Sequence, residues 1–255
     1  MQVTELEPGT RWTATDGAHE AGAFLGRLHR THGWLSVEPD VPPETLRDLA
    51  TALSTEIGLP LVAKAVPGTA RHDQLVAAGA RAYQSCPPSE VDGGRPDNTA
   101  WAAAPYPDGV QVGDVTELGQ GQVLDLFLQL YTWVHEEWGP LTDELAAREH
   151  FGPMLEEALA RELSVVTLRK GTATALAYAL RDGDGPLCVV AEAVDPTRST
   201  ALEDVAIVMR EVVRRTAAAG AAMYFDGHVS DPHYPRVLAT IPTVTGSGLD
   251  LLRLG

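Results

Sequence analysis

The chain has 255 residues, 44% of them hydrophobic, and a formal net charge of −16. A chain of this length can bury one large hydrophobic core or two small ones. Because an acidic field repels phosphate backbones and anionic headgroups, we expect neither nucleic acid nor a membrane as a partner, whereas a small amine fits the charge.

Cysteine usage and hydropathy point to an ordinary intracellular protein. Cys86 and Cys188 are far apart and form no CxxC spacing, so neither a disulfide framework nor a zinc site is predicted. No stretch approaches 18 uninterrupted apolar residues. We therefore expect a cytoplasmic location, while the oligomeric state stays open, a homodimer included.

The first third of the chain alternates predicted strands and helices. The expected elements are strands at 23–30 and 33–39, a helix at 43–57, a strand at 59–66, a short helix at 70–78 and a strand at 80–85. A segment rich in Pro, Gly and Asp follows at 85–109 and predicts a loop. We therefore expect a first lobe at 1–86, a linker at 87–109 and a second lobe at 110–255.

The second lobe is predicted to begin with two helices. One face of a helix at 121–137 carries Val123, Phe127, Leu130, Tyr131 and Val134, and a second helical region is interrupted at Gly152-Pro153. An antiparallel meander is then expected at 163–171, 173–185 and 186–195, before a long helix at 201–219 and a strand at 221–227.

This order of elements resembles the GNAT superfamily of acyl-CoA-dependent acyltransferases. "VAEAVDPTR" (190–198) is similar to the family's fourth strand and its entry to the central helix, and "TARHDQLVAAGARAY" (69–83) to its closing segment. The resemblance implies an α/β (α+β) protein with two GNAT-like lobes, each a mixed, mainly antiparallel sheet flanked by helices. It covers the second lobe fully and the first in abbreviated form, and it implies an N-acyltransferase that uses acetyl-CoA or another acyl-CoA.

The turn that binds the CoA diphosphate in that family is altered here. The family motif is Gln/Arg-x-x-Gly-x-Gly/Ala, and the corresponding residues are Arg198, Ala201 and Glu203, so only the first matches. Thr200 and Glu203 instead have the spacing of a capping box, which would occupy the helix N–H groups that a phosphate needs. In the first lobe Pro42–Glu44 stands at this position, where prolines remove N–H donors.

Candidate catalytic groups cluster in "YFDGHVSDPHYP" (224–235), where the resemblance places the cleft between the fourth and fifth strands. Acyl transfer to an amine needs a base, and His228 and Glu192 are the candidates, with Tyr234 as the acid. A carboxylate inside a strand either points into solvent or is aimed into a cleft, and both remain open for Glu192. By resemblance, the cofactor would contact Ala193, Val194, Arg198, Ser199, Thr200, Ala201 and Asp231. Without HExxH or CxxC spacing, no metal site is expected.

The acceptor is expected near "YTWVHEEWGPL" (131–141). Tyr131, His135 and Trp138 follow i, i+4, i+7 on one predicted helix, and with Glu137 they would suit a small-molecule amine. The alternative is that the aromatic rings belong to the core and the acids to a solvated face. A catalytically degenerate GNAT-fold protein that binds a ligand or a protein without CoA is likewise an alternative to the transferase.

Overall fold

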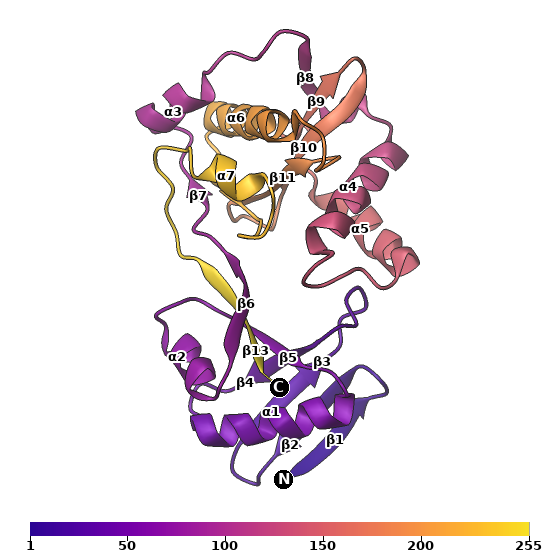
Figure 1. Ribbon diagram of the computed structural model, residues 1–255, viewed down its shortest axis with the longest axis vertical. Helices are drawn as coiled ribbons and strands as arrows, with labels where there is room; N and C mark the ends of the chain where they lie inside the picture. The colour runs from indigo at the N-terminus through magenta and orange to yellow at the C-terminus, as the bar shows by residue number, and fades with distance from the viewer. Residues whose placement is uncertain (255) are drawn as a thin grey trace. The chain divides into compact units, whose positions relative to one another are not determined.

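The computed structural model describes residues 1–254 and divides the chain into two compact units. The first unit contains Met1–Ser85, His135–Ala147 and Ser247–Gly255, and the second contains Cys86–Val134 and Arg148–Gly246. Each unit is built around a mixed sheet flanked by helices, which confirms the predicted α+β fold in two lobes (Figure 1). None of the described helices is long and apolar enough to cross a bilayer.

The sheet of the first unit has the strand order β1-β2-β3-β4-β5-β13-β6. Its elements are β1 (Gln2–Glu7), β2 (Arg11–Thr15), β3 (Glu20–Phe24), β4 (Gly33–Val37), α1 (Pro43–Ile57), β5 (Leu61–Ala65), α2 (Ala70–Ala77), β6 (Arg81–Cys86) and β13 (Leu249–Leu254). Strands β1 to β4 form an antiparallel meander, and β4 pairs with β5 in parallel. The sequence did not predict β1 and β2, whose outward residues are largely polar.

Helix α1 covers one face of this sheet. It begins with Pro43, whose fixed φ suits a first helical residue, and ends at Gly58 in the left-handed region, φ 73°. Leu46, Leu49 and Leu53 recur at helical spacing and pack on the alternate inward residues of the strands. The opposite face of the meander carries polar residues of the strands, among them Arg11, Glu20 and Ser36.

The last strand of the chain lies in the first sheet, not in the second. β13 pairs antiparallel with β5 over five residues, from Asp250 opposite Ala65 to Leu254 opposite Leu61. Leu251, Leu252 and Leu254 are buried. The predicted second lobe at 110–255 therefore has the wrong C-terminal boundary, because the alternation that makes 249–254 a strand does not specify which sheet it joins.

The sheet of the second unit has the order β7-β12-β11-β10-β9-β8. Its elements are β7 (Glu90–Val91), α3 (Pro96–Ala102), β8 (Val110–Asp114), a 3-10 turn (Val115–Glu117), α4 (Gln120–His135), α5 (Glu144–Ala158), β9 (Val165–Arg169), β10 (Thr172–Leu180), β11 (Leu187–Ala193), α6 (Ala201–Ala219), β12 (Met223–Phe225) and α7 (Tyr234–Leu238). The predicted meander is present as β9, β10 and β11.

Helix α6 forms the core of the second unit. Val205, Val208 and Val212 on its buried face pack with the inward residues of β9, β10 and β11. α3 packs on the same helix, with Arg210 over the ring of Trp101 at 5.6 Å from its centroid. The expected linker at 87–109 is thus not a free connection, since β7 forms an edge of the second sheet and α3 covers α6.

Candidate functional site

The second sheet opens between β11 and β12. These parallel strands pair at only three positions, from Leu187 opposite Met223 to Val189 opposite Phe225. A last bond joins Asp226 N to Val189 O at 2.8 Å. Beyond it β11 continues to Ala193 and pairs with β10 alone among the described strands. The predicted residues Glu192 and Tyr234 lie at this gap.

Glu192 bridges the gap between β11 and α7. Its side chain is buried, 2% exposed, and Oε1 accepts hydrogen bonds of 2.8 Å from Ala193 N and from His233 Nδ1. Oε2 accepts from His233 N at 3.3 Å and from Tyr234 N at 2.9 Å. The side chain predicted as a free base is therefore the N-terminal cap of α7, with both oxygens engaged.

His233 is a site residue that the sequence analysis did not select. Its ring is 7% exposed and its Nδ1 is held by Glu192, which fixes the orientation of the imidazole. A histidine oriented by a carboxylate is the arrangement that general bases use in acyl transfer. No spacing signal marks it, because Glu192 and His233 are 41 positions apart in the chain.

His228 and Asp231 form a second buried pair in the loop after β12. Asp231 Oδ2 accepts from His228 N at 2.7 Å, and Oδ1 lies 3.5 Å from His228 Nδ1. Burial lowers the pKa of His228, but the hydrogen bonds and charges of Asp231 and Cys86 outweigh this and raise it to about 9. His228 is therefore a cation at neutral pH, which suits an acid and not the predicted base.

Tyr234 lies in the hydrophobic core of the second unit. It is 1% exposed, and its ring centroid is 6.2 Å from that of Phe225. Burial, with the charges of Asp226 and Asp231, raises the pKa of the phenol. A Cβ at Gly227 would come within 2.5 Å of the Tyr234 ring, so the glycine lets the chain pass directly over it.

The N-terminus of α6 differs from the predicted capping box. Thr200 is the N-cap residue, but its hydroxyl bonds no amide and donates instead to Asp204 Oδ2 at 2.8 Å. Arg169 on β9 pairs with the Glu203 carboxylate and donates to the buried Asp204 at 2.8 Å. The capping-box prediction is thus wrong, because a guanidinium binds these carboxylates more strongly than a backbone amide does.

Two amides of the first helical turn are consequently unoccupied. Ala201 N donates to Arg198 O at 3.0 Å, whereas the N–H groups of Leu202 and Glu203 donate to no acceptor within residues 1–254. Arg198 and Ser199 are exposed beside them. This helix end can therefore still bind an anion.

The backbone at the end of β11 is engaged within the protein. Ala193 N donates to the Glu192 carboxylate, and Val194 N donates to Thr174 O at 3.0 Å. Val194 O accepts from Gln129 Nε2 at 3.1 Å. Any cofactor contact with these two residues would have to replace those bonds or use the carbonyl's second lone pair.

The predicted acceptor residues are divided between the two units. Tyr131 belongs to the second unit and packs between Phe127 and Phe151, with ring centroids 6.1 Å and 4.7 Å away. Burial, together with the charge of Asp226, raises the pKa of its phenol. Tyr131 is thus a half-buried member of an aromatic cluster, and its role toward an acceptor stays a prediction.

His135, Glu137 and Trp138 belong to the first unit. α4 ends at His135, so Trp138 lies beyond the helix and the expected i, i+4, i+7 face does not extend to it. The rings of His135 and Trp138 are nevertheless 4.6 Å apart, and His135 stacks on His29 at 5.2 Å. Glu137 is exposed.

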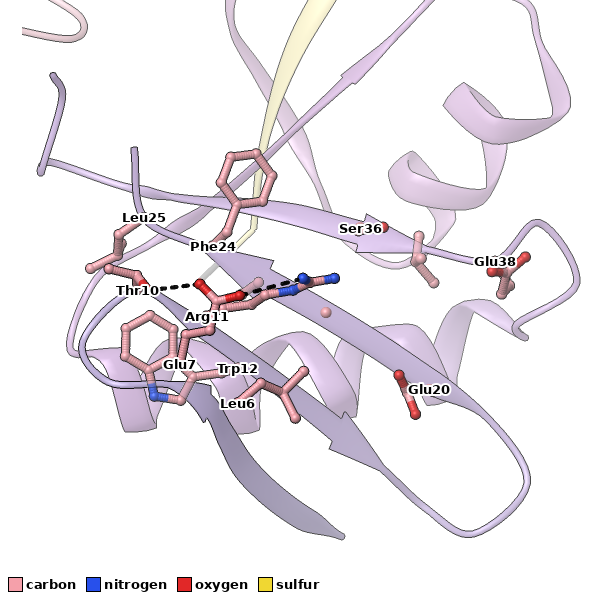
Figure 2. Close-up of a pocket in the computed structure, with 13 residues that line it drawn as sticks. Leu6, Glu7, Thr10, Arg11, Trp12, Glu20, Phe24, Leu25, Ser36 and Glu38 are labelled. Atoms are coloured by element: carbon pink, nitrogen blue, oxygen red, sulfur yellow. Dashed lines mark hydrogen bonds and ion pairs between the residues drawn. The ribbon is translucent and has the colours of Figure 1, made fainter. Parts of the chain in front are cut away.

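The first sheet has a hollow of its own on the face opposite α1, with a volume of about 580 Å³ (Figure 2). The polar and aromatic residues that line it are Glu7, Thr10, Arg11, Trp12, Glu20, Phe24, Ser36 and Glu38. Glu7 lies 3.8 Å from Arg11, and the ring of Phe24 is 49% exposed. With three carboxylates and one cation, this surface favours a positively charged ligand. Within the described residues no group of three or more His, Cys, Asp or Glu is placed to hold a metal ion.

Comparisons with known proteins show likeness in structure only. No protein-family model matches the chain, and no curated protein matches its sequence. A GCN5-related N-acetyltransferase from Sphaerobacter thermophilus superposes with a TM-score of 0.66 at 12% identity, over 96% of this chain and 80% of that one. A tandem GNAT protein from the clavulanic acid biosynthesis pathway gives 0.58 at 11%, over 96% and 83%. A GCN5-related N-acetyltransferase from Kribbella flavida gives 0.52 at 15%, over 96% and 89%. The chain therefore has the GNAT fold, in two lobes arranged in tandem along the sequence.

Proposed function

We propose that the second unit is an N-acyltransferase that moves an acetyl or other acyl group from acyl-CoA to a small-molecule amine. The observation that carries the proposal is the N-terminus of α6, where the amides of Leu202 and Glu203 have no protein acceptor. The gap beyond the last β11–β12 bond lies in the same sheet. Structures that share the fold include named N-acetyltransferases, which supports the proposal.

The residues at this helix end fit a diphosphate in part. Two unbonded amides and the helix dipole attract an anion, and the exposed Arg198 adds a positive charge. The carboxylates of Glu203 and Asp204 oppose it, but both are paired with Arg169, so the net charge of that trio is −1. The thioester of an acyl-CoA supplies an activated carbonyl, and this helix end would hold its diphosphate.

The base that we propose is His233, positioned by Glu192. Glu192 holds Nδ1 of the ring at 2.8 Å, which directs Nε2 as the proton-accepting atom. Glu192 itself already accepts four hydrogen bonds, and His228 is positively charged at neutral pH. In this proposal Glu192 is a positioning residue, and Tyr234, which the sequence analysis proposes as the acid, packs in the core of the second unit.

Titration calorimetry with acetyl-CoA tests the binding half of the proposal. We expect micromolar affinity, which Arg198→Ala weakens severalfold. Arg181→Ala removes the same charge from another exposed site and should leave affinity unchanged. Absence of heat with acetyl-, malonyl- and longer acyl-CoAs would refute the proposal.

The test of the base uses release of CoA thiol with acetyl-CoA and a panel of small amines. His233→Gln should lower kcat by about 100-fold or more with little change in KM for acetyl-CoA, which is the typical effect of losing a general base. Glu192→Gln should lower kcat less than His233→Gln does and should shift the pH dependence of kcat, because the imidazole keeps its reacting nitrogen but loses the carboxylate that orients it.

A CoA-free, ligand-binding GNAT-fold protein is the second candidate function. The acidic first turn of α6 and the hollow of the first sheet, with Glu20 and Glu38 in its lining, are the observations that favour it. Calorimetry with a polyamine such as spermidine distinguishes this candidate function from the transferase. Heat with spermidine that Glu20→Gln/Glu38→Gln abolishes, and none with acyl-CoA, would replace the transferase proposal.

A further inference from the structure

Residues 135–142, called the strap below, pack against the loop between β3 and β4. Thr142 donates two hydrogen bonds to Leu28 O, from its backbone N at 3.0 Å and from its hydroxyl at 3.1 Å. His29 Nδ1 donates to Pro140 O at 3.3 Å, because a carbonyl oxygen can only accept. Both sides of this contact belong to the first unit. A few hydrogen bonds therefore fasten the strap to the loop.

His32 is buried where Gly139 of the strap approaches the loop. The residue is 3% exposed, and a Cβ at Gly139 would lie 3.9 Å from His32 Cε1. Nδ1 of the ring shares a hydrogen bond of 3.2 Å with the Thr31 hydroxyl. Nε2 is buried and makes no hydrogen bond within residues 1–254. The closed strap thus keeps an imidazole out of water with one of its two nitrogens unbonded.

The surroundings of His32 oppose a positive charge on the ring. Burial, with the charges of His29 and Arg253 of β13, lowers the pKa of His32 to about 4. Burial also lowers the pKa of His29. The His32 ring meets the edge of Trp34 at 4.9 Å, and the other face group there is a further cation, Lys64, 5.3 Å from the Trp34 centroid. The closed strap therefore favours neutral His32.

We propose that the strap is an acid-sensitive latch, which protonation of His32 releases from the loop before β4. A charged imidazole without a partner, buried beside cations, must reach water. β4 cannot yield easily, because it pairs with β3 on one side and β5 on the other. The strap is the neighbour with the fewest bonds to break, and such segments open locally at the smallest cost in free energy.

The strap also joins α4, which ends at His135, to α5, which begins at Glu144. The ring of His135 stacks on that of His29 at 5.2 Å, so the end of α4 is attached to the same loop. The predicted acceptor residues His135, Glu137 and Trp138 all lie on the strap. Release would therefore move them, a consequence that rests on the proposed function, whereas the latch itself does not.

The direction of the pH effect follows from the lowered pKa of His32. Stabilisation of the closed strap is full above about pH 6.5, the ordinary value, and is lost as the pH falls through about 4. For one group with these two values, the equilibrium constant for opening rises about 20-fold between pH 7 and pH 5.

Amide hydrogen exchange of the full chain, without acyl-CoA, measures the opening at Thr142, whose N–H bonds across the contact to Leu28 O. After correction for the intrinsic pH dependence of exchange, protection of this amide should fall about 20-fold from pH 7 to pH 5. Amides of β5 in the same unit should keep their protection. His32→Phe, a neutral ring of similar size, and His32→Gln should each shrink the change at least about fivefold.

The control His150→Gln removes an exposed histidine of the second unit and should leave the fall at Thr142 intact. Circular dichroism checks the folding of each variant. Protection of Thr142 that is equal at pH 7 and pH 5 would overturn the inference, as would an undiminished fall in folded His32→Phe or His32→Gln. An equal loss in β5 would show that acid opens the whole unit and not the strap. A His32 NMR titration with a midpoint at or above about 6 would contradict a buried neutral ring. Because no acyl-CoA is present, failure of the proposed function would not change any of these results.

Discussion

The carboxylate of Glu192 offers a sharp test of how the second unit holds α7 against its sheet. The side chain is 2% exposed, and Glu192→Ala would remove the acceptor of four hydrogen bonds at once. The donors left behind belong to Ala193, His233 and Tyr234. They are buried, so they lose their partner without gaining full contact with water.

The expected cost follows from these donors. A buried donor without a partner costs about 1–3 kcal/mol, but the first turn of α7 can admit water to some of the four. We therefore expect Glu192→Ala to lower the free energy of unfolding by about 3–5 kcal/mol, as for breaking a buried ion pair. At about 2–4 °C per kcal/mol for a domain of 150–250 residues, the melting temperature should fall by roughly 6–20 °C.

Urea unfolding followed by circular dichroism measures this change, with Glu162→Ala as the control. Glu162 also pairs with an arginine, Arg181, but its side chain is 65% exposed, so its loss should be close to neutral. Equal unfolding midpoints for the two variants would refute the capping role of Glu192. A Glu192→Gln variant that keeps its stability but loses all transfer activity would instead identify Glu192 as the base itself.

Two further predictions concern the pH dependence of stability, and a third concerns the sheet to which β13 belongs. Burial raises the pKa of Glu211, but the hydrogen bond from Arg214 and those of two neighbours outweigh it and lower the pKa to about 2. The ionised Glu211 therefore stabilises the fold fully above about pH 4.5, and this stabilisation is lost as the pH falls through about 2. In Glu211→Gln, the urea-unfolding midpoint should depend less on pH over that window. Burial lowers the pKa of His228, but Asp231 and Cys86 outweigh this effect and raise the pKa to about 9. The protonated His228 therefore stabilises the fold fully below about pH 6.5, and this stabilisation is lost as the pH rises through about 9. His228→Gln should remove this pH dependence of stability, and an NMR titration of the wild-type imidazole with a midpoint near 6.5 would contradict the prediction. Leu252→Ala in β13 should lower the free energy of unfolding by about 2–5 kcal/mol and speed amide hydrogen exchange in β5 and β6. Faster exchange confined to β11 and β12 would show instead that the strand belongs to the second sheet.

Local patterns determined much of the second unit. The sequence predicted β11 and α6 in their observed order, because periodicity and turn residues act over a few positions. The signals were the apolar run before Asp195, the Pro-containing turn and the long amphipathic repeat from Ala201. The same reasoning located the cluster around His228 and Asp231. It also predicted correctly that the helix begins after Thr200, although not how that end is satisfied.

The partners of those elements came only from the tertiary structure. Arg169 lies 34 positions from Glu203, and its guanidinium decides that the carboxylate leaves the helix amides unbonded. A spacing rule cannot include such a partner, since the competing group is brought in by the pairing of β9 within the sheet. The predicted capping box failed for this reason.

The placement of β7 and β13 shows the same limit at the level of the fold. The sequence by itself determined two GNAT-like sets of strands and helices, because each element is specified by its own periodicity and caps. Whether β7 and β13 join the first sheet or the second depends on which strand edge each can pair with, and every edge offers the same kinds of backbone donors and acceptors. Packing of Leu251, Leu252 and Leu254 in the first sheet decides for β13, and the antiparallel register on β12, with Met223 opposite Val91, decides for β7.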